Sequence, residues 1–341
     1  MEKRIKIVAD KNIPFLEGVF EPYADVAYID GKDICKEDVM GADALVIRTR
    51  TRCNESLLGG SATIGTDHID FDFCNTHNIE VHNAEGCNSG GVMQYVFSAL
   101  YGVASRKAVK LDGATMGIIG VGNVGKKVEH MAEYLGFNVL LCDPPRAAKE
   151  GKDKFCDLDY LLTNSQIVTM HTPLDDTTRC MADSHFFAMM RPGAFFINAS
   201  RGEVVVDDAL KEAIPKLGAV IIDTWNNEPD VDADLLEMVD IATPHIAGYS
   251  YQGKQNGTAS AVRAVARHFG FESLYDFYPP VDVPEHEPVK LDFKGMNQGE
   301  VTSLLQYNYP IFTDDFMFRM QPDKFESLRS EYKYRREIYI D

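Results

Sequence analysis

The sequence predicts an α/β protein with two doubly wound parallel-sheet domains and a small C-terminal domain. Short apolar runs alternate with helix-length polar segments over most of the chain, as expected for the strands and helices of parallel sheets. At about 150 residues per domain, a chain of 341 residues has room for two or three domains. Beyond Phe271 this alternation ends, and prolines and aromatic residues become frequent.

The net charge of the chain argues against several classes of partner. Lys and Arg number 34 against 52 Asp and Glu, so the formal net charge is −18. Because such a field repels polyanions, we expect neither nucleic acid nor an anionic membrane surface as a partner. An anionic small molecule would need a local cluster of Arg or Lys to overcome this charge. No apolar run reaches the roughly 18 residues needed to span a membrane.

Cysteine usage favours a reduced, cytoplasmic protein. The count is odd and no pair has C-x-x-C spacing, so we expect neither a disulfide framework nor a metal site. The first ten residues contain no long apolar segment of the kind found in secretion signals. The cysteines are Cys35, Cys53, Cys74, Cys87, Cys142, Cys156 and Cys180.

The first domain is expected to begin with strands over residues 5–9 and 44–47, separated by segments with helical spacing. In parallel sheets, ligands bind at the carboxyl ends of the strands. The run Arg48-Thr49-Arg50-Thr51-Arg52 follows the second strand at such an end, and it is the densest basic cluster in the first half of the chain. This cluster is therefore a candidate anion site.

Two helical patterns indicate where the chain passes between domains. Apolar residues between 92 and 103 fall on one helical face, and a second such face lies between 262 and 269. Between them, apolar runs end at Ile119, Cys142, Met170, Asn198 and Asp223, as expected for a second parallel sheet. The predicted domains are residues 1–95 with 248–272, residues 96–247, and residues 273–341.

The C-terminal segment is unusually aromatic. From residue 271 to 341, 14 of 71 residues are Phe, Tyr or Trp, about twice the frequency in the whole chain. A segment this short has little core of its own. Composition alone leaves two alternatives open, an extra layer packed on the main body or a dimerisation element.

The run Gly120-Val121-Gly122-Asn123-Val124-Gly125 is the strongest local motif. An apolar strand over residues 116–119 precedes it, and a helix over residues 126–135 follows. The glycines permit a tight turn and close approach of the backbone to a pyrophosphate, and the helix N-terminus offers free N–H groups. The second domain is therefore predicted to be a Rossmann dinucleotide-binding domain.

Asp143 indicates which dinucleotide is bound. It lies 18 residues after Gly125 and directly follows the apolar run 139–142. A carboxylate at this strand end accepts hydrogen bonds from the ribose hydroxyls and repels a 2′-phosphate. NAD is thus favoured over NADP, although the nearby Arg146 weakens that preference.

Three side chains at later strand ends form a candidate catalytic set. Arg201, Glu228 and His245 each follow a predicted strand of the second sheet. Hydride transfer from an alcohol needs a base for the hydroxyl proton, which His supplies with a carboxylate partner. An Arg can hold a substrate carboxylate in a bidentate grip. Each residue alone is common in turns, but together beside a dinucleotide motif they indicate an active site.

Taken together, these blocks resemble the D-2-hydroxyacid dehydrogenases from about residue 5 to 270. The resemblance rests on residues 120–125, 143–144, 171–174, 198–202, 223–229 and 243–247. Further blocks point to one subfamily, whose members carry an appended dimerisation domain. These are residues 48–51, 54–58, 62–68, 86–88, 141–146, 245–249 and 328–337. The resemblance implies oxidation of 4-phospho-D-erythronate to 2-oxo-3-hydroxy-4-phosphobutanoate with NAD, on the route to pyridoxal phosphate.

The resemblance also implies roles for individual residues. His245 would be the acid/base, Glu228 its partner and Arg201 the catalytic carboxylate clamp. Thr49, Thr63 and Tyr249 would contact the substrate, and Arg48, Arg335 and Arg336 are candidates for its phosphate. The C-terminal domain would form a homodimer. Besides the glycine motif, the NAD site would be lined by Asp143, Thr172, Ala199, Ser200, Arg201, Asp223 and Gly248.

Other interpretations remain open at this point. Another D-2-hydroxyacid dehydrogenase, such as a phosphoglycerate dehydrogenase, or a NAD-sensing binding protein with the same fold would share most of these motifs. The connection between Leu58 and Ala62 is also shorter than in the family, which has a further short apolar strand there. Loss of an internal strand would leave its neighbours without backbone partners.

Overall fold

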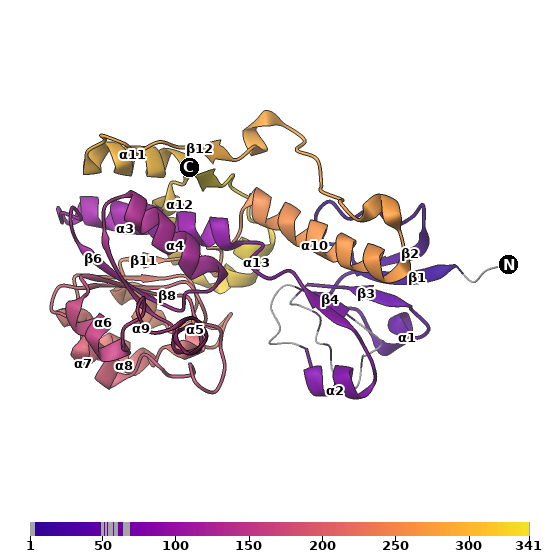
Figure 1. The fold of residues 1–341 in the computed structure, drawn as a ribbon, viewed down its shortest axis with the longest axis horizontal. Helices are drawn as coiled ribbons and strands as arrows, with labels where there is room; N and C mark the ends of the chain where they lie inside the picture. The colour runs from indigo at the N-terminus through magenta and orange to yellow at the C-terminus, as the bar shows by residue number, and fades with distance from the viewer. Residues whose placement is uncertain are drawn as a thin grey trace. The chain divides into compact units, whose positions relative to one another are not determined.

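A computed structural model describes residues 4–48, 51, 53, 57, 61–63 and 69–340 (Figure 1). The chain folds into two compact units. One contains Met1–Asn88 and Tyr251–His286, and the other contains Ser89–Ser250 and Glu287–Asp341.

The first unit is built on a five-stranded parallel sheet in the order β2-β1-β3-β4-β5. Its core includes Ile7, Val46 and Phe20, together with Val262 and Ala266 from its longest helix. The strands are β1 (Ile5–Asp10), β2 (Ala24–Ile29), β3 (Ala44–Val46), β4 (Ser61–Thr63) and β5 (Val81–Asn83). The helices are α1 (Lys36–Val39), α2 (Phe71–Thr76) and α10 (Tyr251–Phe269), with short 3-10 turns at Glu272–Leu274 and Pro284–His286.

The short connection before Ala62 does not interrupt this sheet. Strand β4 lies between β3 and β5, pairing through Val46 with Ala62 on one side and along Ser61–Thr63 on the other. Among the described residues, Val46 and Ala62 are the pair that joins β3 to β4. The internal position is nevertheless filled, and β5 keeps a backbone partner.

The second unit is built on a six-stranded parallel sheet in the order β11-β10-β9-β8-β6-β7. Helices α3 and α4 lie over one face and α6 to α8 over the other (Figure 1). The strands are β6 (Thr115–Ile119), β7 (Asn138–Cys142), β8 (Ile167–Met170), β9 (Phe195–Asn198), β10 (Ala219–Ile222) and β11 (Ile241–Ala242). The helices are α3 (Ser89–Arg106), α4 (Asn123–Tyr134), α5 (Pro144–Glu150), α6 (Leu158–Asn164), α7 (Ser184–Met189), α8 (Asp207–Ala213) and α9 (Ala233–Met238). Two 3-10 turns lie at Gly202–Val204 and Ile214–Lys216.

Aspartate caps start several of these helices. Asp157, Asp183 and Asp232 each accept a hydrogen bond from a backbone N–H in the first turn of the helix that follows. Such caps satisfy N–H groups that have no partner inside the helix. The caps fix where the short helices α6, α7 and α9 begin, and therefore where each connecting loop ends.

The C-terminal segment packs into the second unit. Val301 and Leu305 join the core on the α3 side of the sheet, whereas Phe318 and Phe325 join the core on the other side. The segment contains β12 (Val289–Lys290), α11 (Gln298–Asn308), α12 (Ile311–Met320), a 3-10 turn at Pro322–Lys324, α13 (Phe325–Ser330) and β13 (Ile338–Tyr339). Strands β12 and β13 pair with each other in parallel.

The two predicted parallel sheets wound with helices are confirmed. The C-terminal segment belongs to the second unit, and a separate small C-terminal domain stays a prediction. The boundaries 95/96, 247/248 and 272/273 remain predictions. In the structure, the chain passes between units near Asn88, Tyr251 and His286. Among the described residues, no helix is both long and apolar enough to cross a membrane.

Candidate active site

The glycine-rich turn links β6 to α4 in the second unit. Gly120 has a positive φ of 83°, a conformation that glycine adopts without strain. A Cβ at Gly125 would lie 2.1 Å from the Gly120 carbonyl oxygen, so the strand and helix can approach only if that residue lacks a side chain. Helix α4 begins at Asn123 after Gly122, with no side-chain cap. Its first N–H groups therefore suit an anion.

Asp143 lies at the end of β7 and organises the same turn. Its Oδ2 accepts the Val121 N–H at 2.8 Å, and its Oδ1 accepts the Arg146 N–H at 2.9 Å as the cap of α5. Each carboxylate oxygen has two lone pairs, so capacity remains for a ribose hydroxyl. The carboxylate is half-buried at the position predicted for the ribose.

Arg146 is held by an ion pair. Its Nε and Nη2 donate to the two Glu150 oxygens at 2.7 and 2.6 Å, and its Nη1 donates to the Val121 carbonyl at 2.7 Å. Bidentate pairing of this kind is the strongest geometry for a guanidinium and a carboxylate. Glu150 thus neutralises Arg146, the cation close to Asp143 in the sequence that would otherwise favour a 2′-phosphate.

The residues after β8 leave polar atoms unsatisfied. Thr172 Oγ1 and His171 Nδ1 are buried and have no hydrogen-bond partner among the described residues. Burial lowers the pKa of His171 from 6.5 to about 3, so this ring is neutral at physiological pH. An orphaned hydroxyl beside the glycine-rich turn, together with the uncapped α4, fits a dinucleotide as the missing partner.

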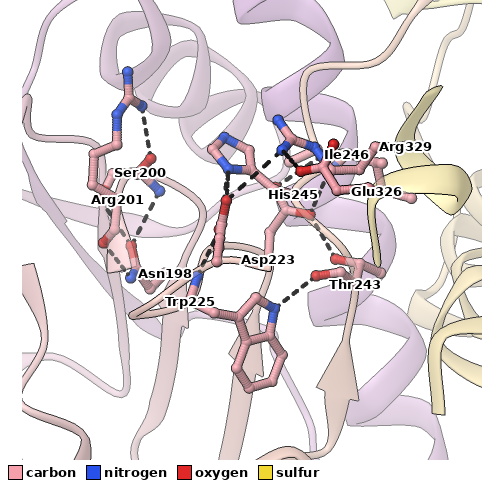
Figure 2. A network of polar contacts seen from close by, with 12 residues as sticks. Asn198, Ser200, Arg201, Asp223, Trp225, Thr243, His245, Ile246, Glu326 and Arg329 are labelled. Atoms are coloured by element: carbon pink, nitrogen blue, oxygen red, sulfur yellow. Dashed lines mark hydrogen bonds and ion pairs between the residues drawn. The ribbon is translucent and has the colours of Figure 1, made fainter. Parts of the chain in front are cut away.

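Arg201 is positioned by the turn after β9. The Asn198 side chain accepts the Ser200 hydroxyl at 2.8 Å and donates to the Arg201 carbonyl at 2.9 Å. Arg201 Nη1 donates to the Ser200 carbonyl at 2.8 Å, and its side chain stands half-exposed (Figure 2). Ala199, which lies between Asn198 and Ser200 in the chain, is partly buried against the core. The turn therefore presents a guanidinium beyond the strand end.

Glu228 and His245 form a direct pair. The His245 Nδ1 lies 2.8 Å from Glu228 Oε2 and 3.1 Å from Oε1, and the Trp225 N–H donates to Oε1 at 2.9 Å. Burial acts to raise the pKa of Glu228, but hydrogen bonding and charge from His245, with the Trp225 N–H, outweigh it and lower that pKa. An ionised Glu228 on Nδ1 leaves Nε2 as the ring atom available for proton exchange.

Asp223 supports the loop that carries His245. Its carboxylate accepts the backbone N–H groups of Ile246 and Ala247 at 2.8 and 2.9 Å, and the Thr243 hydroxyl at 2.7 Å. The residue is fully buried, and this burial raises its pKa against the effect of those hydrogen bonds. In this structure Asp223 shapes the loop, while its predicted place in the NAD site remains a prediction.

The C-terminal segment reaches the same loop. Tyr249 lies edge-on to Tyr332 and Tyr334, with ring centroids 6.1 and 6.4 Å away, and Gly248 beside it is half-buried. Arg335 is buried, and its guanidinium donates to backbone carbonyls of this loop. The prediction of Arg335 as a phosphate ligand is wrong for this structure, because its donors hold the protein backbone. Arg336 is half-buried, and its phosphate role remains a prediction.

The predicted substrate contacts in the first unit are described only in part. Arg48 Nε donates to the fully buried Asp10 at 2.7 Å, which holds the guanidinium at the end of β3. Thr49 lies outside the described residues. The backbone of Thr63 ends β4, but its side chain is not among the described ones. Asp10 was missed by sequence reasoning, although its position at the end of the first apolar run marks the same sheet edge.

Arg329 was also missed as a site residue. Its guanidinium lies near Glu228, as seen beside His245 in Figure 2. In the sequence, Arg329 is marked only by its place in residues 328–337, one of the segments on which the resemblance rests. Among the described residues, no group of three or more His, Cys, Asp or Glu side chains could hold a metal ion.

Comparison with known proteins agrees with the class that the fold and these residues define. Residues 99–247 match the model of the D-isomer specific 2-hydroxyacid dehydrogenase NAD-binding domain. The structure resembles NAD⁺-bound 3-phosphoglycerate dehydrogenase from Entamoeba histolytica, with a TM-score of 0.68 and 23% identity over 80% of this chain and 98% of that one. It also resembles D-lactate dehydrogenase from Aquifex aeolicus, with a TM-score of 0.64 and 22% identity over 80% and 98%.

Relatives similar over nearly the whole length narrow the assignment. Erythronate-4-phosphate dehydrogenase of Bacteroides fragilis is 42% identical over 98% of this chain and 97% of its own. The enzyme of that name from Yersinia pestis is 38% identical over 98% and 93%. The chain belongs to the erythronate-4-phosphate dehydrogenase family. This confirms the predicted resemblance, the dehydrogenase class and NAD as the cofactor.

Proposed function

We propose that this protein oxidises 4-phospho-D-erythronate to 2-oxo-3-hydroxy-4-phosphobutanoate with NAD, as a step in pyridoxal phosphate synthesis. The main support for this proposal is the Glu228–His245 pair beside the Rossmann sheet, with 2.8 Å between Glu228 Oε2 and His245 Nδ1. The chain that contains it is 42% identical to an erythronate-4-phosphate dehydrogenase. A NAD-sensing protein has no need for a paired acid/base. A phosphoglycerate dehydrogenase is less well supported, because the similarity to one is at the level of the fold.

His245 acts as the base in this reaction. Glu228 holds Nδ1, so Nε2 accepts the proton of the substrate 2-hydroxyl as the C2–H bond breaks. The nicotinamide of a bound NAD would supply the acceptor for the hydride that leaves C2. The positive charge that forms on the imidazole is stabilised by the ionised Glu228 carboxylate, whose pKa is already lowered by its neighbours. In the reverse direction, the imidazolium returns the proton.

Arg201 orients the substrate. A guanidinium grips a carboxylate through two parallel hydrogen bonds, which fixes the neighbouring carbon relative to the base. The Ser200 carbonyl anchors one Arg201 nitrogen, which restricts the orientation of the guanidinium. The same charge stabilises the carboxylate of the 2-oxo product.

NAD is held by groups on the second unit. The uncapped N-terminus of α4 and the open space beside Gly122 suit its pyrophosphate. Asp143 accepts the ribose hydroxyls, and the unpartnered Thr172 hydroxyl supplies a further contact. The remaining members of the predicted lining are Asn123, Val124, Ala199, Ser200, Asp223 and Gly248.

Arg48 is the proposed ligand of the substrate phosphate. Asp10 fixes the Nε side of that guanidinium, which leaves the Nη edge to face the ligand. Thr49, Thr63 and Tyr249 complete the proposed substrate contacts.

The test is NADH formation with a panel of substrates: 4-phosphoerythronate, erythronate, 3-phosphoglycerate and D-lactate. We expect the highest kcat/KM with 4-phosphoerythronate, and a loss of about 100-fold or more in His245→Ala with NAD affinity unchanged. Normal turnover by that variant, or no oxidation of any substrate by the wild-type protein, would refute the proposal.

We further propose a cytoplasmic homodimer formed through the C-terminal segment. Several of its large apolar side chains are exposed in the single chain, which is typical of a surface that pairs with a second copy. They are Met296, Tyr307, Phe316, Met317 and Met320. Light scattering should show a dimer, and Phe316→Asp together with Met320→Asp should yield monomers. A monomeric wild-type protein would refute this arrangement.

A further inference from the structure

The guanidinium of Arg329 lies beside the carboxylate of the catalytic pair. Its Nη1 is 4.0 Å from Glu228 Oε2 and 3.6 Å from Glu326 Oε1, and Figure 2 shows it next to His245. The Arg329 side chain is 18% exposed and that of Glu228 is 19% exposed. Charges shielded from water to this degree interact more strongly than charges at the surface.

The contacts of Arg329 differ from those of Arg319 and Arg335 in the C-terminal segment. Arg319 donates to backbone carbonyls and to the Asp315 carboxylate, and the buried Arg335 donates to backbone carbonyls. Arg329 instead stacks near the Phe325 ring, 5.6 Å from its centroid, and its buried Nε has no hydrogen-bond partner among the described residues. Its burial is therefore explained by the carboxylates that it faces rather than by the backbone.

The charged groups around the pair are few. Glu228 faces His245 and Arg329. The guanidinium of Arg329 faces Glu228 and Glu326, and it also interacts electrostatically with the Tyr249 phenol and the buried Asp223. The Asp223 carboxylate, which supports the loop that carries His245, also interacts electrostatically with the His245 ring. Arg329 is thus the cation that directly opposes a second positive charge on the imidazole.

We propose that Arg329 is a positioning residue for the reaction, whose charge acts through Glu228 on the proton affinity of His245. This inference rests on the proposed role of His245 as the base. The guanidinium shares the negative charge of Glu228, so the carboxylate holds the imidazolium less tightly. Because oxidation needs a neutral imidazole to take the hydroxyl proton, Arg329 extends oxidation to lower pH.

The ionisation of Glu228 agrees with this arrangement. Burial works to raise its pKa, yet the pKa is lowered overall by His245, the Trp225 N–H and the charge of Arg329. The guanidinium therefore contributes to keeping the carboxylate charged in the folded protein.

The test compares the pH dependence of kcat/KM for oxidation in the wild type, Arg329→Met and Arg329→Lys. Methionine keeps the apolar stem and removes the charge, so the acid limb should move up by about 0.5–1 pH unit. Lysine keeps the charge, so the limb should return toward the wild-type position. Lys324→Met is the matched control: it removes an exposed cation two residues before Glu326 and should leave the limb unchanged.

An NMR titration of the His245 ring in the cofactor-free protein gives a readout that does not need turnover. The signal is assigned with His245→Asn, and its midpoint should rise in Arg329→Met and not in Lys324→Met. If Arg329→Met does not fold, Glu326→Gln tests the same charge with the opposite sign: loss of the competing carboxylate should move the limb to lower pH.

The outcomes separate this inference from the proposed function. Absence of oxidation by the wild type contradicts the proposed function, whatever the titration shows. An active wild type whose acid limb and His245 midpoint do not move in Arg329→Met overturns the role of Arg329. An equal shift in Lys324→Met also overturns it, because the effect would then follow from net charge alone.

Discussion

The guanidinium of Arg335 stacks over the ring of Tyr309, 4.0 Å from its centroid, with both side chains buried. From this position it donates hydrogen bonds to the carbonyls of Ile246, Ala247 and Tyr249, which follow His245 in the chain. Arg335, in the C-terminal segment, therefore holds the backbone of the loop that carries His245.

Replacing Arg335 with lysine should loosen this loop although the charge is kept. An ammonium group cannot reproduce the planar fork, so buried carbonyls lose their donors, at a cost of about 2–3 kcal/mol in the free energy of unfolding. We expect a lower kcat for oxidation and a nearly unchanged affinity for NAD. Urea unfolding and single-turnover kinetics measure these effects. A destabilised variant with wild-type kcat would show that the loop holds its geometry without Arg335.

Glu228→Gln should change both catalysis and the pH dependence of stability. The amide cannot stabilise an imidazolium, so kcat should fall by about 10–100-fold. Because the folded-state pKa of Glu228 is lowered, its carboxylate stabilises the wild type above the ordinary pKa of 4.5, and this advantage is lost as pH falls through the lower folded value. Urea unfolding at pH 7 and pH 3 should show the difference between wild type and variant shrinking. A constant difference would contradict the assignment.

Arg48→Ala should separate phosphorylated from plain substrates. If the Nη edge of Arg48 binds the phosphate, the KM for 4-phosphoerythronate should rise about 10-fold or more, whereas turnover of erythronate should change little. Asp10→Asn is the companion variant, because it removes the carboxylate that holds Arg48 without removing the cation. Equal loss on both substrates in Arg48→Ala would place the residue outside the phosphate site.

Glu150→Ala should relax the preference for NAD. Loss of the bidentate partner frees Arg146 for a 2′-phosphate, so kcat/KM with NADP should rise by about 3–10-fold while that with NAD stays within about 2-fold. Adding Arg146→Met should cancel the gain. No gain with NADP in the single variant would mean that Glu150 does not govern the choice of cofactor.

The sheet of the second unit was largely predictable, because its strands are buried on both faces and appear as continuous apolar runs. The predicted ends at Ile119, Cys142, Met170 and Asn198 coincide with the ends of β6, β7, β8 and β9. Helix α4 begins at Asn123 rather than at Lys126, because the motif itself supplies the first turn. In the first unit, β2, β4 and β5 were missed. Strand β2 lies in a stretch that was expected to be helical, and β4 and β5 have only three residues each and include polar ones.

Within the candidate site, the Glu228–His245 pair was accessible from sequence because strand order brings their loops to one edge of the sheet. The roles of Arg329 and Arg335 were not. Arg329 lies more than 80 residues from Glu228, and Arg335 lies more than 80 residues from the loop carbonyls that it binds. Nothing in a local pattern distinguishes such a guanidinium from a solvated one. The burial of Arg335 follows only from the tertiary packing, which encloses its guanidinium between Tyr309 and the loop carbonyls.

The double use of Asp143 limits how this enzyme can change its coenzyme. The carboxylate that would repel NADP also fastens Val121 in the glycine-rich turn and starts α5. A substitution of Asp143 that admits the 2′-phosphate therefore also removes the hydrogen bond to Val121 in the glycine-rich turn, which must bind the cofactor. Drift toward NADP is expected to proceed through Glu150, whose carboxylate holds the side chain of Arg146 rather than the glycine-rich turn.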